Sequence, residues 1–247
     1  MTAAPFISRK TGQFAYFARQ VGDWDWQTKN VLDFGGNIGN MLRDAGSTID
    51  HRRYWCLDVV DESTAEGRRR FPDAHWHFYD RYCFYFNPRG VRGLPLPDLG
   101  VKFDYILAYS VFTNTGPSDM LEMVPQLEAM LADGGALAFT FIDAGFRPWD
   151  HYPGTNFEWR LNREGGDPSS LQGRRMTRQA LEAKWCVLVN GEELFVESEE
   201  IGHYPPEAQQ SHHTFYSTPY MRTLFPHASI QEPVEDEMQH CCVIRKR

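Results

Sequence analysis

The fold is decided at Asp33-Phe34-Gly35-Gly36-Asn37-Ile38-Gly39, where a short apolar run ends abruptly at two glycines. The run from Val31 to Phe34 is typical of a buried strand, and helical character resumes at Asn40. A strand that turns through glycines into a helix leaves a backbone surface that a ligand can approach closely. This stretch therefore predicts the first strand, turn and helix of an open α/β sheet, with a ligand site at the turn.

Strand-like and helix-like segments alternate through the first two thirds of the chain. We expect further strands at 54–59, 75–79, 103–109 and 135–142, and helices at 14–21, 63–70 (capped by Ser63) and 119–131 (ended by Asp133-Gly134-Gly135). A helix from Ser217 and closing strands at 228–231 and 240–244 follow near the end of the chain. Such alternation produces a mostly parallel sheet with helices on both faces, here open and seven-stranded with its last strand antiparallel.

The alternation breaks after Asp143. Residues 144–216 contain turn residues, aromatic residues, a helix candidate at 177–184 and a predicted hairpin around Asn190-Gly191. We predict a core domain formed by 1–143 and 217–247, with 144–216 inserted as a substrate-binding cap after the fifth strand. The aromatic residues of this insertion would form either a lid over a flat substrate or the insertion's own small core.

The composition limits the partners and the compartment. The chain has 25 Lys and Arg against 33 Asp and Glu, a net charge of −8, which disfavours nucleic acid because binding draws on the neutralisation of phosphates. The amino terminus contains no apolar run of the length that a signal peptide or membrane span requires. We therefore expect a cytoplasmic protein with a small-molecule substrate and no membrane partner, and leave homodimer formation open. The five cysteines form no CxxC pair, which favours free thiols over a disulfide framework or a metal site.

Acidic residues also end the next two strands. Asp58 lies 25 positions after Asp33, close to the spacing of about 20 at which an acid meets the ribose hydroxyls in nucleoside-binding folds. Asp80 ends the third strand in the same way. The alternative for Asp58 is that it only caps the turn that follows. NAD fits less well, because the dinucleotide fingerprint counted from Gly35 meets Asn37 where it requires glycine.

These residues resemble the first motif of the class I S-adenosylmethionine (SAM)-dependent methyltransferases, an acid-x-Gly-x-Gly-x-Gly loop, with Asn37 in place of the middle glycine. Asn tolerates the positive φ that such a turn requires. Residues 103–114 resemble the family's fourth-strand segment, and 215–220 resemble the start of its last helix.

The resemblance implies a Rossmann-like fold, SAM as cofactor and S-adenosylhomocysteine as product. It implies that Asp58 holds the ribose hydroxyls, that Asp80 holds the adenine amino group and that Arg81 covers the ring. The cofactor-binding residues that it implies are Asp33, Gly35, Gly36, Asn37, Gly39, Asp58, Val59, Asp80, Arg81, Ser110 and Phe112.

Methyl transfer from a sulfonium needs alignment of the reactants but no metal and no protein nucleophile. A general base is needed only where the acceptor arrives protonated, and the candidates are His151, His212, His213 and Tyr109. We expect oxygen or nitrogen methylation of a small metabolite, as in natural product biosynthesis. Two alternatives remain: a same-fold enzyme that uses bound SAM for a rearrangement or elimination, and a non-catalytic binding subunit.

Overall fold

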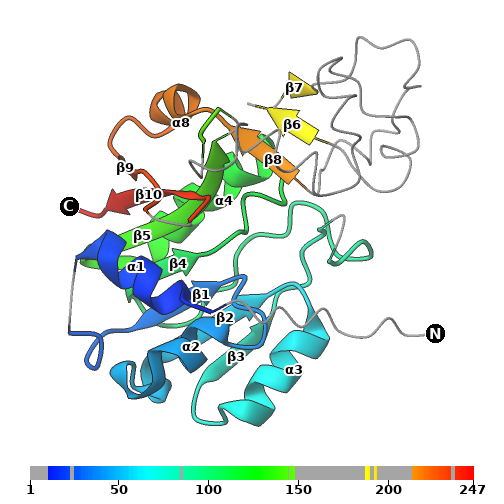
Figure 1. The fold of residues 1–247 in the computed structure, drawn as a ribbon. Coiled ribbons are helices and arrows are strands. Elements are labelled where there is room, and N and C mark those ends of the chain that lie inside the picture. Colours follow the sequence, from blue (N-terminus) through cyan, green and yellow to red (C-terminus); the bar gives the residue numbers. More distant parts are fainter. Residues whose placement is uncertain are drawn as a thin grey trace.

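A computed structural model describes residues 11–22, 25–83, 86–143, 145–147, 187–189, 192–193, 213–234 and 237–247. The elements up to the centre of the sheet, in chain order, are α1 (Gln13–Val21), β1 (Val31–Phe34), α2 (Asn40–Ala45), β2 (Tyr54–Asp58), α3 (Asp61–Arg70), β3 (His75–Phe78) and β4 (Phe103–Ala108) (Figure 1). The elements that follow are α4 (Pro117–Met130), β5 (Leu131–Asp143), β6 (Val187–Val189), β7 (Glu192–Glu193), β8 (His213–Tyr216), α8 (Thr218–Leu224), β9 (Ser229–Gln231) and β10 (His240–Arg245). Two short 3-10 turns, Gly46–Thr48 and His51–Arg53, connect α2 to β2.

The main sheet has the strand order β3-β2-β1-β4-β5-β10-β9. Its first five strands are parallel, and β10 runs antiparallel to both β5 and β9. The prediction of an open, mostly parallel sheet with an antiparallel last strand is therefore confirmed. Because β1 to β4 are parallel, their carboxyl ends meet at one edge, where open α/β sheets bind ligands.

The strands β8, β6 and β7 extend this sheet beyond the tip of β5. Ile142 pairs with Phe215 in a parallel ladder, and β6 pairs with β8 in the same sense. The antiparallel pairing of β6 with β7 confirms the predicted hairpin. This part of the expected insertion thus continues the main sheet, whereas the helix candidate at 177–184 lies outside the described residues, and the division into core and cap stays a prediction.

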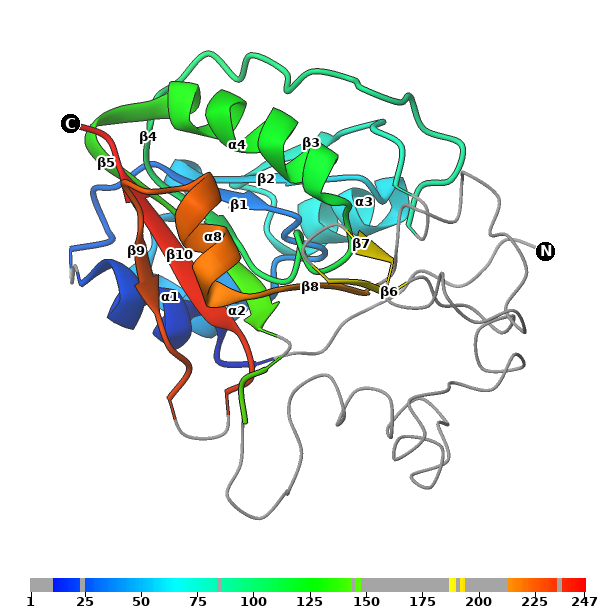
Figure 2. The same cartoon turned by 90° about the horizontal axis from the view of Figure 1, so that it is seen from above.

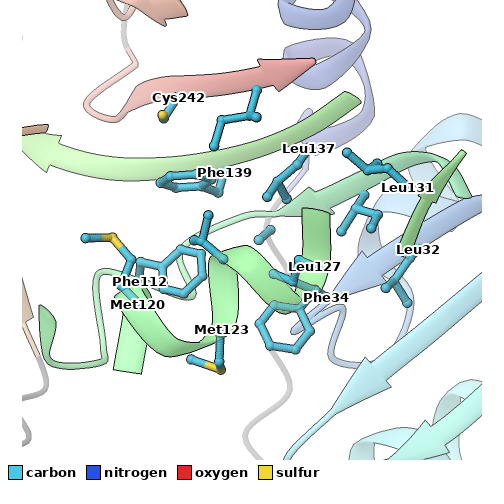
Figure 3. Packing of buried hydrophobic residues seen from close by; sticks show 14 of the residues in the cluster. Leu32, Phe34, Phe112, Met120, Met123, Leu127, Leu131, Leu137, Phe139 and Cys242 are labelled. Atoms are coloured by element: carbon cyan, nitrogen blue, oxygen red, sulfur yellow. The ribbon is translucent and has the colours of Figure 1, made fainter. Parts of the chain in front are cut away.

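Helices cover both faces of the sheet, with α1, α2 and α3 on one face and α4 and α8 on the other (Figure 2). The strands β1 and β2 are buried along their whole length, as expected for strands covered on both faces. The neighbours Cys241 and Cys242 illustrate the two layers, since each belongs to a different core cluster. The cluster on the α4 side is drawn in Figure 3, where side chains of α4 such as Met123 and Leu127 lie over β1 and β5.

Two predicted boundaries are wrong. The helix α3 begins at Asp61 and its N-cap residue is Val60, so Ser63 lies buried in the first turn and does not cap the helix. Asp61 and Glu62 instead supply the negative charge that favours a helix start.

The second wrong boundary is Asp133-Gly134-Gly135, which does not end α4, because the helix stops at Met130 and β5 already begins at Leu131. Gly134 has a φ of 76°, and the register between β4 and β5 shifts in this stretch. The glycines therefore form an irregularity within the strand.

Four of the cysteines lie in the described segments. No disulfide joins Cys56, Cys83, Cys241 and Cys242, and all of these except Cys83 are buried. In the same segments, every helix is too short or too polar to cross a membrane.

Candidate cofactor site

Three strand ends meet around the predicted ligand site. The backbone N–H of Gly35, just after β1, donates to the carbonyl of Leu57 in β2 at 2.8 Å. The N–H of Tyr79, just after β3, donates to the carbonyl of Asp58 at 2.8 Å. The segments after β1 and β3 therefore flank the end of β2, and the acids at these strand ends share one edge of the sheet.

The turn after β1 follows a left-handed path. Gly35, Asn37 and Gly39 have φ values of 76°, 54° and 82°. Asn37 thus adopts a left-handed backbone conformation that glycine favours. The expectation that asparagine preserves this turn is confirmed.

Other side chains of the protein pack so closely against the glycines of the turn that a Cβ would clash with them. A Cβ on Gly36 would lie 2.6 Å from the carboxylate of Asp33 and 2.8 Å from Cys56 Sγ. A Cβ on Gly35 would lie 2.5 Å from Val111 Cγ2, on the segment after β4. Glycine is therefore required here by internal close packing as well as by backbone conformation, a reason that the sequence did not disclose.

Asn37 provides a test of the turn. Asn37→Ala is expected to lower the free energy of unfolding by about 1 kcal/mol, because alanine resists a positive φ. Asn37→Gly, which matches the motif of the resemblance, is expected to keep the stability within about 0.5 kcal/mol of the original. Urea unfolding of both variants measures this difference, and an alanine variant as stable as the glycine variant would contradict it.

Asp58 is joined directly to the turn. Its carboxylate accepts the N–H of Asn37 at 2.7 Å and the N–H of Val60 at 2.8 Å. Burial raises the pKa of Asp58 to about 6, against the lowering effect of these backbone N–H groups. The bond from Val60 shows that Asp58 does cap the next turn, but each carboxylate oxygen keeps capacity for a further donor, so a role against ribose hydroxyls stays a prediction.

Asp33 lies beneath the turn. Its carboxylate is buried and accepts the hydroxyl of Tyr54 at 2.5 Å. Burial raises the pKa of Asp33 to about 7, the hydrogen bond from Tyr54 lowers it, and the charge of Asp58 raises it. The carboxylate of Asp33 therefore lies directly against Gly36, on the inner side of the turn.

Asp80 and Arg81 follow β3 but have different surroundings. Asp80 is exposed and accepts the side-chain amide of Asn87 at 3.0 Å. Arg81 is buried, and its guanidinium donates to Asp119 at 2.5 Å and to Glu122 at 2.8 Å, both on α4. Arg81 therefore ties the segment after β3 to α4, while the role that the resemblance gives it against an adenine ring stays a prediction.

The remaining predicted cofactor residues follow β2 and β4. Val59 is half-buried against the α4-side core. Phe112 is fully buried and packs against Phe34 and Phe139, so it belongs to that core. Ser110 has a φ of 58° and lies at the carboxyl end of β4.

The candidate bases are described only in part. His151 and His212 lie outside the described residues, and His213 is described in β8 by its backbone alone. Tyr109 makes edge-on contacts with Tyr16 and Phe17 of α1, at ring-centroid distances of 5.5 and 6.0 Å. Burial raises the pKa of Tyr109 to about 12, so its phenol stays protonated at neutral pH and can donate a hydrogen bond.

Sequence reasoning missed three buried polar residues near this edge. Thr140 and Gln239 hydrogen-bond to Ser110, and Thr140 could have been noticed as the polar residue within the apolar run of β5. His240 is buried against Phe141 and Phe146, and burial lowers its pKa. No sequence signal distinguished Gln239 or His240 from ordinary strand-end residues. Among the described side chains, no cluster of His, Cys, Asp or Glu is arranged to hold a metal ion.

The structure has an open, mostly parallel sheet, a left-handed glycine turn after its first strand and an acid at the end of its second strand, which together define a Rossmann-like fold. Comparison with known proteins refines this class. Residues 32–137 match the family model of a methyltransferase domain. This stretch, from β1 to the middle of β5, is therefore similar to a methyltransferase domain, and the fold is shared with a SAM-dependent methyltransferase of known structure.

Solved structures share the fold at low sequence identity. A SAM-dependent methyltransferase from Clostridium acetobutylicum matches with 11% identity and a TM-score of 0.55, over 98% of this chain and 93% of that one. CalS10, an amino pentose methyltransferase from Micromonospora echinaspora, matches with 16% identity and a TM-score of 0.54, over 98% and 93%. Magnesium protoporphyrin IX methyltransferase from Synechocystis PCC 6803 matches with 11% identity and a TM-score of 0.50, over 94% and 81%, in a structure with bound S-adenosylhomocysteine.

Proposed function

We propose that this chain binds SAM at the turn after β1 and at Asp58, and transfers its methyl group to an oxygen or nitrogen of a small molecule. The observation that carries the proposal is the hydrogen bond from the Asn37 N–H to the Asp58 carboxylate. This bond joins the two predicted halves of the site, so the acid and the turn are already aligned with each other.

The strand order indicates how SAM would lie along the sheet edge. With the ribose at Asp58 on β2, the adenine points toward β3 and Asp80, at one side of the sheet. The methionine part then extends the other way, over the ends of β1 and β4. Gly35 and Ser110 occupy those two ends.

SAM supplies an activated methyl group when bound, so the chain's own task is to bind, orient and exclude water. Asp58 would fix the ribose, and the backbone at Gly35 and Ser110 would orient the amino-acid part. Tyr109 would donate a hydrogen bond to a substrate and would not remove its proton, because its pKa is raised to about 12. A base from His151, His212 or His213 stays part of the proposal only for an acceptor that arrives protonated.

A small metabolite of the natural-product type is the acceptor class that we favour. The net charge of −8 disfavours a nucleic-acid substrate. CalS10, which shares the fold, acts on an amino pentose in calicheamicin biosynthesis. In this proposal residues 144–216 bind the acceptor and the reaction takes place in the cytoplasm.

Mass spectrometry with a panel of amino sugars and phenols tests the proposal. The purified chain, SAM and each candidate acceptor are incubated together, and we expect one product heavier by a single methyl group, formed with an equal amount of S-adenosylhomocysteine. Turnover without a change in mass and without S-adenosylhomocysteine would instead support a rearrangement or elimination. Failure to bind any adenosine ligand would support a non-catalytic binding subunit.

A further inference from the structure

The backbone at the end of β4 is held in an unusual conformation. Ser110 has a φ of 58°, in the left-handed region that residues with a side chain rarely occupy. Such conformations persist where the surroundings impose them, and they concentrate at ligand sites. At Ser110, the surrounding contacts include those with Thr140 and Gln239.

Two buried side chains, Thr140 of β5 and Gln239 just before β10, close a ring of hydrogen bonds around Ser110. Its N–H donates to Thr140 Oγ1 at 2.7 Å, and this hydroxyl donates to Gln239 Oε1 at 2.5 Å. The amide Nε2 of Gln239 donates to Ser110 Oγ at 2.5 Å. Each group both gives and receives a hydrogen bond, so the three residues restrain one another.

Gln239 also connects this ring to α1. Its backbone carbonyl accepts the hydroxyl of Tyr16 at 3.0 Å, and Arg19 pairs with Glu237 two residues earlier in the chain. The ring of Tyr16 in turn contacts Tyr109, next to Ser110. A single residue before β10 therefore links the last segment of the chain, the helix α1 and the end of β4.

The position of this ring separates it from the nucleoside part of the proposed site. Asp58 lies on β2, whereas Ser110 follows β4, on the other side of β1. Val111, next to Ser110, lies against Gly35, where a Cβ would be 2.5 Å from its side chain. The bend at Ser110 thus determines the position of Val111 against the turn.

We propose that Thr140 and Gln239 are positioning residues that hold Ser110 and Val111 in place against the methionine and sulfonium part of SAM. This inference rests on the proposed function. Neither residue touches the cofactor itself. They act through Ser110, so their loss affects recognition of the homocysteine part and spares recognition of adenosine.

Calorimetry with adenosine and with S-adenosylhomocysteine tests this division. Thr140→Val keeps the shape of the side chain and removes its hydroxyl, Thr140→Ser retains the hydroxyl, and Gln239→Ala removes the amide. We expect Thr140→Val and Gln239→Ala to weaken S-adenosylhomocysteine binding about tenfold, the scale of one lost hydrogen bond, with adenosine binding unchanged within about twofold. Thr140→Ser should restore the original affinity for both ligands.

A matched control separates positioning from loss of stability. Val243 lies on β10 and packs in the same core cluster as Cys241. The substitution Val243→Ala creates a cavity there and leaves the three hydrogen-bonded residues unchanged. It should lower the melting temperature and leave both affinities unchanged. If Thr140→Val does not fold, Gln239→Ala decides by the same criterion.

The outcomes distinguish this inference from the proposed function. An equal loss of both ligands in the variants, or no loss of either, would overturn the positioning role while the original chain still binds both. An original chain that binds neither adenosine nor S-adenosylhomocysteine would overturn the proposed function, and this inference with it.

Discussion

Asp58→Ala is expected to weaken the binding of SAM by about 1–3 kcal/mol, a factor of roughly 5 to 150 in the dissociation constant. The carboxylate is buried and aligned by the N–H groups of Asn37 and Val60, so its loss removes a charged acceptor that no neighbouring group replaces. The same residue gives the binding a pH dependence. Because burial raises its pKa to about 6, affinity should fall as the pH drops below about 6, where the carboxyl becomes protonated and accepts the ribose hydroxyls less well.

Isothermal titration calorimetry measures both effects. Asp61→Asn is the matched control, because it changes the charge of an exposed acid only three residues away. Circular dichroism at the titration temperature establishes that the Asp58 variant remains folded, since the substitution also removes the acceptor of two backbone N–H groups. An Asp58 variant that binds SAM as tightly as the Asp61 variant would remove Asp58 from the site.

Asp33→Asn is expected to stabilise the chain without ligand by about 2 kcal/mol at pH 8. Burial raises the pKa of Asp33 from 3.8 to about 7, so the folded chain binds this proton more tightly than the unfolded chain does. The ionised carboxylate therefore costs folding free energy above about pH 7. That cost declines as the pH falls toward 4 and is absent below the ordinary pKa. Asparagine is neutral at every pH and still offers an oxygen to the hydroxyl of Tyr54.

Urea unfolding at pH 8 and pH 5 measures this difference. The gain from Asp33→Asn should be larger at pH 8, and Asp73→Asn, at an exposed acid, should leave stability within about 0.5 kcal/mol at both. If Asp33→Asn instead lowered the free energy of unfolding, and by the same amount at pH 8 and pH 5, the prediction would be wrong. The carboxylate would then contribute through its hydrogen bond with Tyr54 and not through the cost of its charge.

The sequence was sufficient for those parts of the fold that local pattern determines. The strand β1 and the turn through Asn37 follow from an apolar run and from residues that tolerate positive φ. The antiparallel β10 follows from the order of elements and the resemblance. The start of α3 was misjudged because Ser63 is a strong capping residue by type, yet Asp61 and Glu62 already complete the first turn before it.

Partners far apart in the chain could not be predicted in this way. Arg81 meets Asp119 across 38 positions, and Thr140 meets Gln239 across 99. Periodicity reports whether a residue is buried, but it does not report which polar group faces it once the sheet has formed. The arrangement of the site around Ser110 depends on such contacts, so the bend after β4 became visible only in the structure.

In the proposed function, the turn after β1 and the carboxylate of Asp58 together hold the nucleoside of SAM. A crystal structure of the chain with S-adenosylhomocysteine would show whether they do. Density for the ligand is expected along the carboxyl edge of the sheet, with its ribose hydroxyls within hydrogen-bonding distance of Asp58 and its homocysteine part beside Gly35 and Ser110. A ligand bound elsewhere, or the protein's own side chains filling that edge at saturating ligand, would contradict it.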